Sequence, residues 1–352
     1  MFRYLMIYLL KTINSNRSPA AIYHILTGKK SSQTIQDLHL FQLHTYYRLL
    51  PNLSRQAFDY DVDQMVNEGL MEWLNAKDYR LTDKAWDYLS TYKDTCDEAH
   101  NFERPIDHQS KEIFTKRFYL TIQTFTQRVM DDTGFIPLID DITIQAFVKQ
   151  YYHLHKHALR DWLEQCYEQL YDVLKTYPDI RRHIYLDRLS TANHNGQSLQ
   201  QLVDRYHVTE ADILLTLALI ERTLFIRSQQ HQTLLSDLLP ADNQPKIYER
   251  LMTRSARKTH QLVIKGYKIE DLIQLRQLKR GTIEDHLVEI CMLDDHFKLD
   301  DYVEEEKIAI IESYLSKRHT QKLAELKRTL PEEMTYLDLR LVFAHYQKRL
   351  HQ

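Results

Sequence analysis

Basic side chains gather in one segment and give it the chemistry to bind phosphate. Between Lys246 and Gly281 the chain holds ten lysine or arginine residues against three acidic ones, a net charge of +7. Such side chains neutralise nucleic-acid phosphates and release their counterions. The candidate contact residues here are Arg254, Arg257, Lys258, Lys265, Lys268, Arg276, Lys279 and Arg280. The segment therefore predicts contact with a nucleic-acid backbone or with an acidic partner protein.

The next segment carries the opposite charge. From Thr282 to Glu312 there are two basic residues and eleven acidic ones, a net charge of −9. Thr282, a further candidate contact, is followed closely by Glu284 and Asp285. Carboxylates at the start of a recognition helix repel phosphate and pair favourably only with the amino group of cytosine. We expect this helix to read the major groove poorly, so a partner protein complementary to the charge division is an equal contender.

The other reactive side chains do not form a set. His153 and His157 are one helical turn apart, which suits a metal ion, but no carboxylate or cysteine nearby in the sequence completes a site. No CxxC pair occurs among Cys96, Cys166 and Cys291, which fits a reducing compartment, the cytoplasm. Six glycines in 352 residues leave no phosphate-binding loop or nucleophile elbow. We predict no enzyme activity, cofactor, metal or small-molecule substrate.

Two helix-turn-helix units are predicted to position the charged segments. We call them the first frame (residues 198–220) and the second frame (residues 271–290). In each, buried side chains recur at fixed offsets around a short turn. In the second frame Thr282 is expected to cap the second helix, and Gly266 to end the helix before the frame. In the first frame Asp212 takes the capping position. The expected buried positions are Ile273, Leu278, Ile283 and Leu287 in the second frame, and Val203, Val208, Ile213 and Leu217 in the first.

A winged unit is predicted near the N-terminus. A helix from Tyr60 to Glu68 ends at Gly69, and the strand-like LMEWL and YRLT flank the polar turn NAKD before another helix. Lys77 in the wing and Arg80 beside it are candidate contacts. Such a unit serves protein contact as readily as DNA contact.

The sequence predicts a mainly helical fold with one small winged hairpin. Polar stretches at Tyr92–Lys111 and Leu238–Lys246 separate three expected domains: a winged domain (1–95), a helical middle domain with the first frame (110–240) and a C-terminal helix-turn-helix domain (246–352). Amphipathic helices are expected over Lys111–Met130 and Thr143–Tyr177. The opening MFRYLMIYLLK is too short to span a membrane and is expected to form a core helix.

Both ends of the chain resemble one family. RQLKRGTIEDHLVEI and LPEEMTYLDLRLVFAHY are similar to the helix-turn-helix module at the C-terminus of many bacterial RecQ-type helicases and of YpbB-like proteins. The opening IYHILTGKKSSQTIQDLHLFQL resembles the N-terminal signature of the YpbB-like family. The resemblance implies an accessory protein of a RecQ-like helicase and supplies no catalytic residues.

Two functions remain open from the sequence. The first is a non-enzymatic adaptor that binds a RecQ-like DNA helicase, and DNA weakly through the basic segment, in DNA repair or recombination. The second is a transcription regulator that reads DNA with the winged unit or with the helix after Thr282, which would require dimers and palindromic sites.

Overall fold

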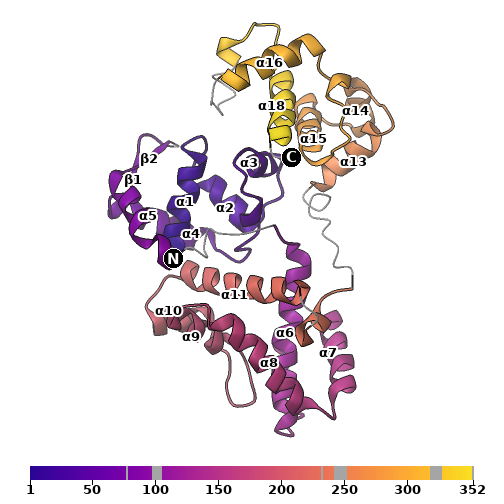
Figure 1. Cartoon of the computed structure of the whole chain (residues 1–352). Helices are drawn as coiled ribbons and strands as arrows, with labels where there is room; N and C mark the ends of the chain where they lie inside the picture. Colours follow the sequence, from indigo (N-terminus) through magenta and orange to yellow (C-terminus); the bar gives the residue numbers. More distant parts are fainter. Residues whose placement is uncertain (77, 97–104, 231–232, 242–251, 318–326, 351–352) are drawn as a thin grey trace. The chain divides into compact units, whose positions relative to one another are not determined.

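The computed structural model is mainly helical, with a single two-stranded sheet in the part of the chain that it describes (Figure 1). It describes residues 1–76, 78–96, 105–230, 233–241, 252–317 and 327–350. The predicted fold class is confirmed. No helix in these ranges is both long enough and apolar enough to cross a membrane. Parts of both predicted linkers lie outside the described residues.

The chain divides into two compact units, each assembled from segments distant in sequence. Unit 1 comprises residues 1–5, 52–65 and 88–245, and unit 2 comprises residues 6–51, 66–87 and 246–352. The boundary passes through three helices: α1 (Phe2–Ile13), α4 (Arg55–Asn67) and α5 (Asp83–Cys96). The three domains expected from the sequence stay a prediction.

Unit 1 is built around one long helix. This helix, α11 (Glu210–Gln230), is apolar on all sides and packs against α6, α8, α9, α10 and η3. Helix α6 adds Phe114 and Phe118, and Phe114 meets Phe225 of α11 edge-on. The other elements are α6 (His108–Val129), α7 (Ile142–His155), α8 (Leu159–Leu174), α9 (Asp179–Arg188), α10 (Leu199–Tyr206) and the 3-10 helix η3 (Leu234–Leu238).

The single helix expected over Thr143–Tyr177 is wrong, because the chain breaks between α7 and α8. Ala158 leaves helical geometry at φ −134° and ψ 32°. The break lets Trp162 fold back so that its indole N–H donates to the Tyr151 hydroxyl at 2.9 Å. Trp162 also meets Phe125 edge-on, with ring centroids 4.7 Å apart. Burying this aromatic group outweighs the continuity of one helix.

The N-terminal part of unit 2 contains the predicted wing. Strands β1 (Met71–Trp73) and β2 (Tyr79–Leu81) are antiparallel, with Glu72 opposite Arg80. Gly69 turns the chain out of α4 at φ +68°, a conformation that glycine adopts without strain. The buried Tyr79 hydroxyl donates to the Leu10 carbonyl oxygen of α1 at 2.9 Å and so anchors the hairpin. This part also holds α2 (Ala20–Thr27), α3 (Ser32–Leu40) and η1 (His44–Tyr46).

The C-terminal part of unit 2 is centred on α15 (Arg280–Leu293). This helix packs against α13, α14, α18 and α3, and Figure 1 shows it among the C-terminal helices. Gly266 has φ +84°, which confirms the predicted break after the preceding helix. The other elements are α13 (Arg254–Val263), α14 (Ile269–Arg276), η4 (Leu299–Asp301), α16 (Glu305–Lys317) and α18 (Tyr336–Leu350).

Candidate nucleic-acid interface

Two three-helix arrangements correspond to the predicted frames. Helices α9, α10 and α11 contact one another, and so do α13, α14 and α15. Each turn contains one residue in the left-handed conformation, His207 with φ 53° in the first frame and Gln277 with φ 51° in the second. Ile213 and Ile283 then occupy matching fully buried positions on the following helix. Both frames therefore share a turn geometry as well as a pattern of apolar residues.

The buried residue of the first helix differs by one position from the prediction in both frames. Leu272 and Leu202 are fully buried, whereas Ile273 and Val203 are only half-buried. In α10 and α14 two apolar residues are adjacent, and either one fits the expected spacing. The structure buries the leucine of each pair. Leu278 and Val208 in the turns are also only half-buried, so the predicted set is wrong at four positions and right at Ile283, Leu287, Ile213 and Leu217.

The predicted caps are also wrong. Lys279 is the N-cap of α15, and its carbonyl oxygen accepts from the Thr282 backbone N–H at 2.9 Å, so Thr282 lies within the first turn. In the first frame the Thr209 hydroxyl accepts from the Asp212 backbone N–H at 3.2 Å. Thr209 therefore caps α11, and Asp212 follows three residues later.

Neither second helix presents a free face. Residues 286–292 of α15 are all buried, and α11 is buried over residues 213–220 without interruption. A recognition helix must expose base-reading side chains along the groove. Since both helices are enclosed within their own units, neither is available to read base edges along its length.

Two buried polar side chains fix α15 in unit 2. The Glu289 carboxylate accepts from the hydroxyls of Ser32 and Thr253, both at 3.2 Å, and from the Thr253 backbone N–H. Burial raises the pKa of Glu289 above its ordinary value, and these hydrogen bonds act against that rise. His286 Nδ1 lies 2.9 Å from the Thr259 hydroxyl, and burial, followed by the Arg276 charge, lowers the pKa of His286. Glu289 thus links α3 and the start of α13 to α15.

Helix α13 displays the predicted basic residues on one face. Arg254, Arg257 and Lys258 are exposed at spacings of three and four, and Lys265, also exposed, lies just beyond the last residue of the helix, Val263. Ala256 and Thr259 on the opposite face are fully buried. We call Arg254, Arg257, Lys258 and Lys265 the basic face. A continuous row of this kind suits the spacing of backbone phosphates.

Three of the predicted arginines in the basic segment have partners inside the protein, and one of them, Arg257, belongs to the basic face and donates to the Met252 carbonyl oxygen at 3.4 Å. Arg276 donates to the Ser255 carbonyl oxygen at 3.0 Å and to the Thr259 hydroxyl, so it joins α14 to α13. Arg280 pairs with Glu270 and lies 3.7 Å from Glu284. Lys268 and Lys279 are exposed. The structure therefore places three exposed cations together on α13 and four more, Lys265, Lys268, Lys279 and Arg280, beyond its end.

Exposed apolar side chains accompany the basic face and were missed in the sequence. Ile264 is 71% exposed, Leu275 is 56% exposed, and Tyr267 between them is 39% exposed. Their periodicity matched that of core positions, so the sequence held no signal of their exposure. Scattered exposed apolar residues are ordinary, but Ile264 and Tyr267 lie together in the α13–α14 turn, whereas Leu275 lies in the last turn of α14.

The winged unit lacks a basic reading helix. The helix before the hairpin, α4, contains Asp59, Asp61 and Asp63 against the single cation Arg55. Arg80 pairs with Glu72 across the hairpin at 2.7 Å, and Lys77 lies outside the described residues. His153 and His157 are exposed, and no group of three or more metal-ligating side chains occurs in the described ranges.

Comparison with known proteins agrees with this geometry. Residues 255–343, which hold α13, α14, α15 and much of α18, match the family model of a helix-turn-helix domain. That domain type suggests nucleic-acid binding or regulation. The chain is also similar to Protein YpbB of Bacillus subtilis (strain 168), at 26% identity over 94% of this chain and 93% of that protein. No solved structure matches. The module shared with RecQ-type helicases stays a prediction.

Proposed function

We propose that this chain is a non-enzymatic adaptor that contacts a nucleic-acid backbone through the basic face of α13 and binds a RecQ-like DNA helicase. The nucleic-acid part of the proposal rests on the burial of α15 within unit 2. Because α15 is buried, the cations proposed to contact phosphate are those exposed on α13, the helix before the second frame, together with Lys265 just after it. Lysine and arginine on that helix can reach phosphates without entering a groove.

This arrangement predicts affinity without sequence preference. Phosphate contacts fix the position of a protein on DNA, whereas base-edge contacts specify sequence. Glu284 and Asp285 follow directly after the first turn of α15, and Asp285 pairs with Arg340. The acidic α4 of the winged unit adds no alternative reader. A sequence-specific regulator would need an exposed, non-acidic reading helix in one of these places.

The helicase part of the proposal is supported by the character of one surface and by resemblance. The α13–α14 turn combines Lys265 and Lys268 with the exposed Ile264 and Tyr267. A tyrosine beside an exposed apolar side chain, surrounded by charged residues, is typical of a hot spot in a protein–protein interface. The YpbB-like resemblance of both chain ends suggests the same partner class.

The nucleic-acid part is tested by fluorescence anisotropy on single-stranded, duplex and forked DNA over a salt series. Replacing Arg254, Lys258 and Lys265 by alanine should weaken binding equally for unrelated sequences. For duplex DNA the slope of log K against log salt should become shallower by about 3, since each lost phosphate contact contributes roughly 0.9. The matched control is Lys149→Ala, Lys156→Ala and Arg160→Ala, three exposed cations of unit 1.

The helicase part is tested by repeating the titration with the cognate RecQ-like helicase and by pulldown at low salt. Tighter binding of forked DNA with the helicase present supports the adaptor. Binding that depends on one palindromic sequence and on dimerisation would replace the adaptor with the transcription regulator. No DNA binding, with or without the helicase, would reject both.

A further inference from the structure

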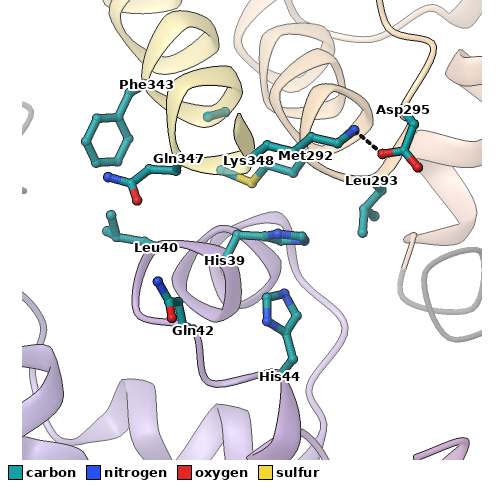
Figure 2. Close-up of a pocket in the computed structure, with 11 residues that line it drawn as sticks. His39, Leu40, Gln42, His44, Met292, Leu293, Asp295, Phe343, Gln347 and Lys348 are labelled. Atoms are coloured by element: carbon teal, nitrogen blue, oxygen red, sulfur yellow. Dashed lines mark ion pairs between the residues drawn. The ribbon is translucent and has the colours of Figure 1, made fainter. Parts of the chain in front are cut away.

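A pocket of about 360 Å³ lies within unit 2 and plays no part in the proposed function. It is formed by the end of α3 and the residues after it, by the end of α15 and by α18 (Figure 2). This volume is at the lower end of the range for small-molecule sites. Its lining mixes apolar side chains, two amides and several titratable groups.

Three side chains that can carry positive charge converge on this pocket from three elements. His39 belongs to α3, His44 begins η1 and Lys348 lies on α18. The two imidazole rings meet edge-on with their centroids 4.4 Å apart. The His39 Nε2 atom is buried and has no hydrogen-bond partner among the described residues. A buried polar atom of this kind usually awaits a water or a ligand.

A single carboxylate among the lining residues faces these groups. Lys348 Nζ lies 2.8 Å from Asp295 and donates to the Asp294 carbonyl oxygen at 2.6 Å. The Asp295 side chain is 72% exposed, against 16% for Lys348. Figure 2 shows this ion pair at one side of the pocket. The carboxylate is therefore solvated while the Lys348 side chain is largely buried, and an anion can replace Asp295 at little cost.

From this convergence we infer that the pocket binds the phosphate monoester of a nucleotide. Lys348 and the two histidines would hold the phosphate, because each can donate charge-assisted hydrogen bonds. Gln42 and Gln347 also line the pocket, and a glutamine amide can pair with the edge of adenine. Phe343 supplies aromatic surface for the base. The inference rests on this pocket alone and does not depend on the basic face.

Proton uptake should accompany binding. Burial first, then His44 and Lys348, lower the pKa of His39 to about 3, so this imidazole is neutral in the empty pocket at neutral pH. A phosphate dianion favours the charged form of each neighbouring histidine and raises its pKa. Binding should therefore take up protons to the extent that the phosphate raises the pKa of His39 toward the pH of the measurement.

Isothermal titration calorimetry on the full chain tests the inference with adenosine monophosphate, adenosine and inorganic phosphate as probes. Adenosine monophosphate should bind at least about tenfold more tightly than adenosine, and Lys348→Met should weaken it about tenfold or more, the effect of losing one charge-assisted contact. Lys298→Met, an exposed lysine of the same unit that does not line the pocket, is the matched control. Repeating the titration in buffers of different ionisation enthalpy measures the protons taken up.

The phosphate monoester could come from a free nucleotide or from the end of a nucleic-acid strand. Titrating short single-stranded DNA with and without a terminal phosphate distinguishes these two sources. A preference for the phosphorylated strand assigns the site to nucleic-acid ends, and no preference assigns it to free nucleotides. Equal binding of adenosine and its monophosphate would overturn the inference. The same holds if millimolar adenosine monophosphate gives no heat and no shift of histidine NMR signals, or if Lys348→Met binds like the parent chain. Circular dichroism confirms that the variant is folded, and His44→Gln serves as a second variant.

Discussion

Replacing Asp61 by asparagine should stabilise the protein at neutral and alkaline pH. Asp61 lies on α4, is 2% exposed, and its Oδ2 atom has no hydrogen-bond partner among the described residues. Burial, and then the charge of Asp212, raise the pKa of Asp61 to about 7, although Arg3 and the terminal ammonium act in the opposite direction. Asp212 itself pairs with the ammonium of Met1 at 3.0 Å.

The sign and size of the effect follow from linkage. A carboxyl whose pKa is higher in the folded state binds its proton more tightly there, so the folded state is favoured at low pH. This contribution is complete below the ordinary value of 3.8 and is lost as the pH rises through about 7. Each pKa unit corresponds to about 1.4 kcal/mol, which gives a cost of about 4 kcal/mol above neutrality. Asparagine has nearly the same shape and cannot ionise, so it removes this cost.

The free energy of unfolding is measured by urea titration with far-ultraviolet circular dichroism at several pH values between about 4 and about 8, the range over which the linked proton is released. The advantage of Asp61→Asn over the parent chain should be smallest at the acid end and reach up to about 4 kcal/mol above neutrality. Asp63→Asn on the exposed side of the same helix is the control. An advantage that is independent of pH, or no larger than that of Asp63→Asn, would refute the reasoning.

Three further predictions concern the frames, and each is checked by denaturant unfolding. His207→Gly and Gln277→Gly should each stabilise the protein by about 0.5–1 kcal/mol, because glycine adopts φ near +50° without strain. Glu289→Ala should destabilise it by about 2–3 kcal/mol, since buried hydroxyl and amide donors lose their acceptor; a loss below 0.5 kcal/mol would contradict the role given to Glu289. Leu272→Ala should cost about 3 kcal/mol and Ile273→Ala about 1 kcal/mol, and the reverse order would restore the register expected from sequence.

The sequence predicted those turns and helix ends that depend on residues close together in the chain. Gly69 and the Asn75–Asp78 turn marked the wing, and Asp78 donates its backbone N–H to the Asn75 side chain at 2.9 Å. Gly266 marked the end of a helix in the same way. The α7–α8 break has neither glycine nor proline at residues 156–158, so periodicity carried the expected helix through it. Its cause is the distant packing of Trp162.

The enclosure of α15 could not be predicted, because it depends on contacts between residues far apart in sequence. Ser32 on α3 reaches Glu289 on α15, and α18 covers another side of the same helix. The acidic start of α15 predicted poor groove reading, but only this packing shows that its central turns are closed to any ligand. The basic face was predicted by charge, whereas the inward direction of Arg276 depends on its rotamer and on Ser255.

The helices that precede the two frames, α9 and α13, differ in what they expose, and this difference argues that the basic face is functional. If exposed cations were a by-product of the frame, α9 would carry them as α13 does. On α9, Arg181 is buried and Arg182 pairs with Asp179, while Ile180 and Leu186 are 45% and 42% exposed. The same fold thus presents an apolar surface in unit 1 and a cationic one in unit 2. The three-helix arrangement alone therefore does not account for the cations of α13, and phosphate contact supplies an explanation.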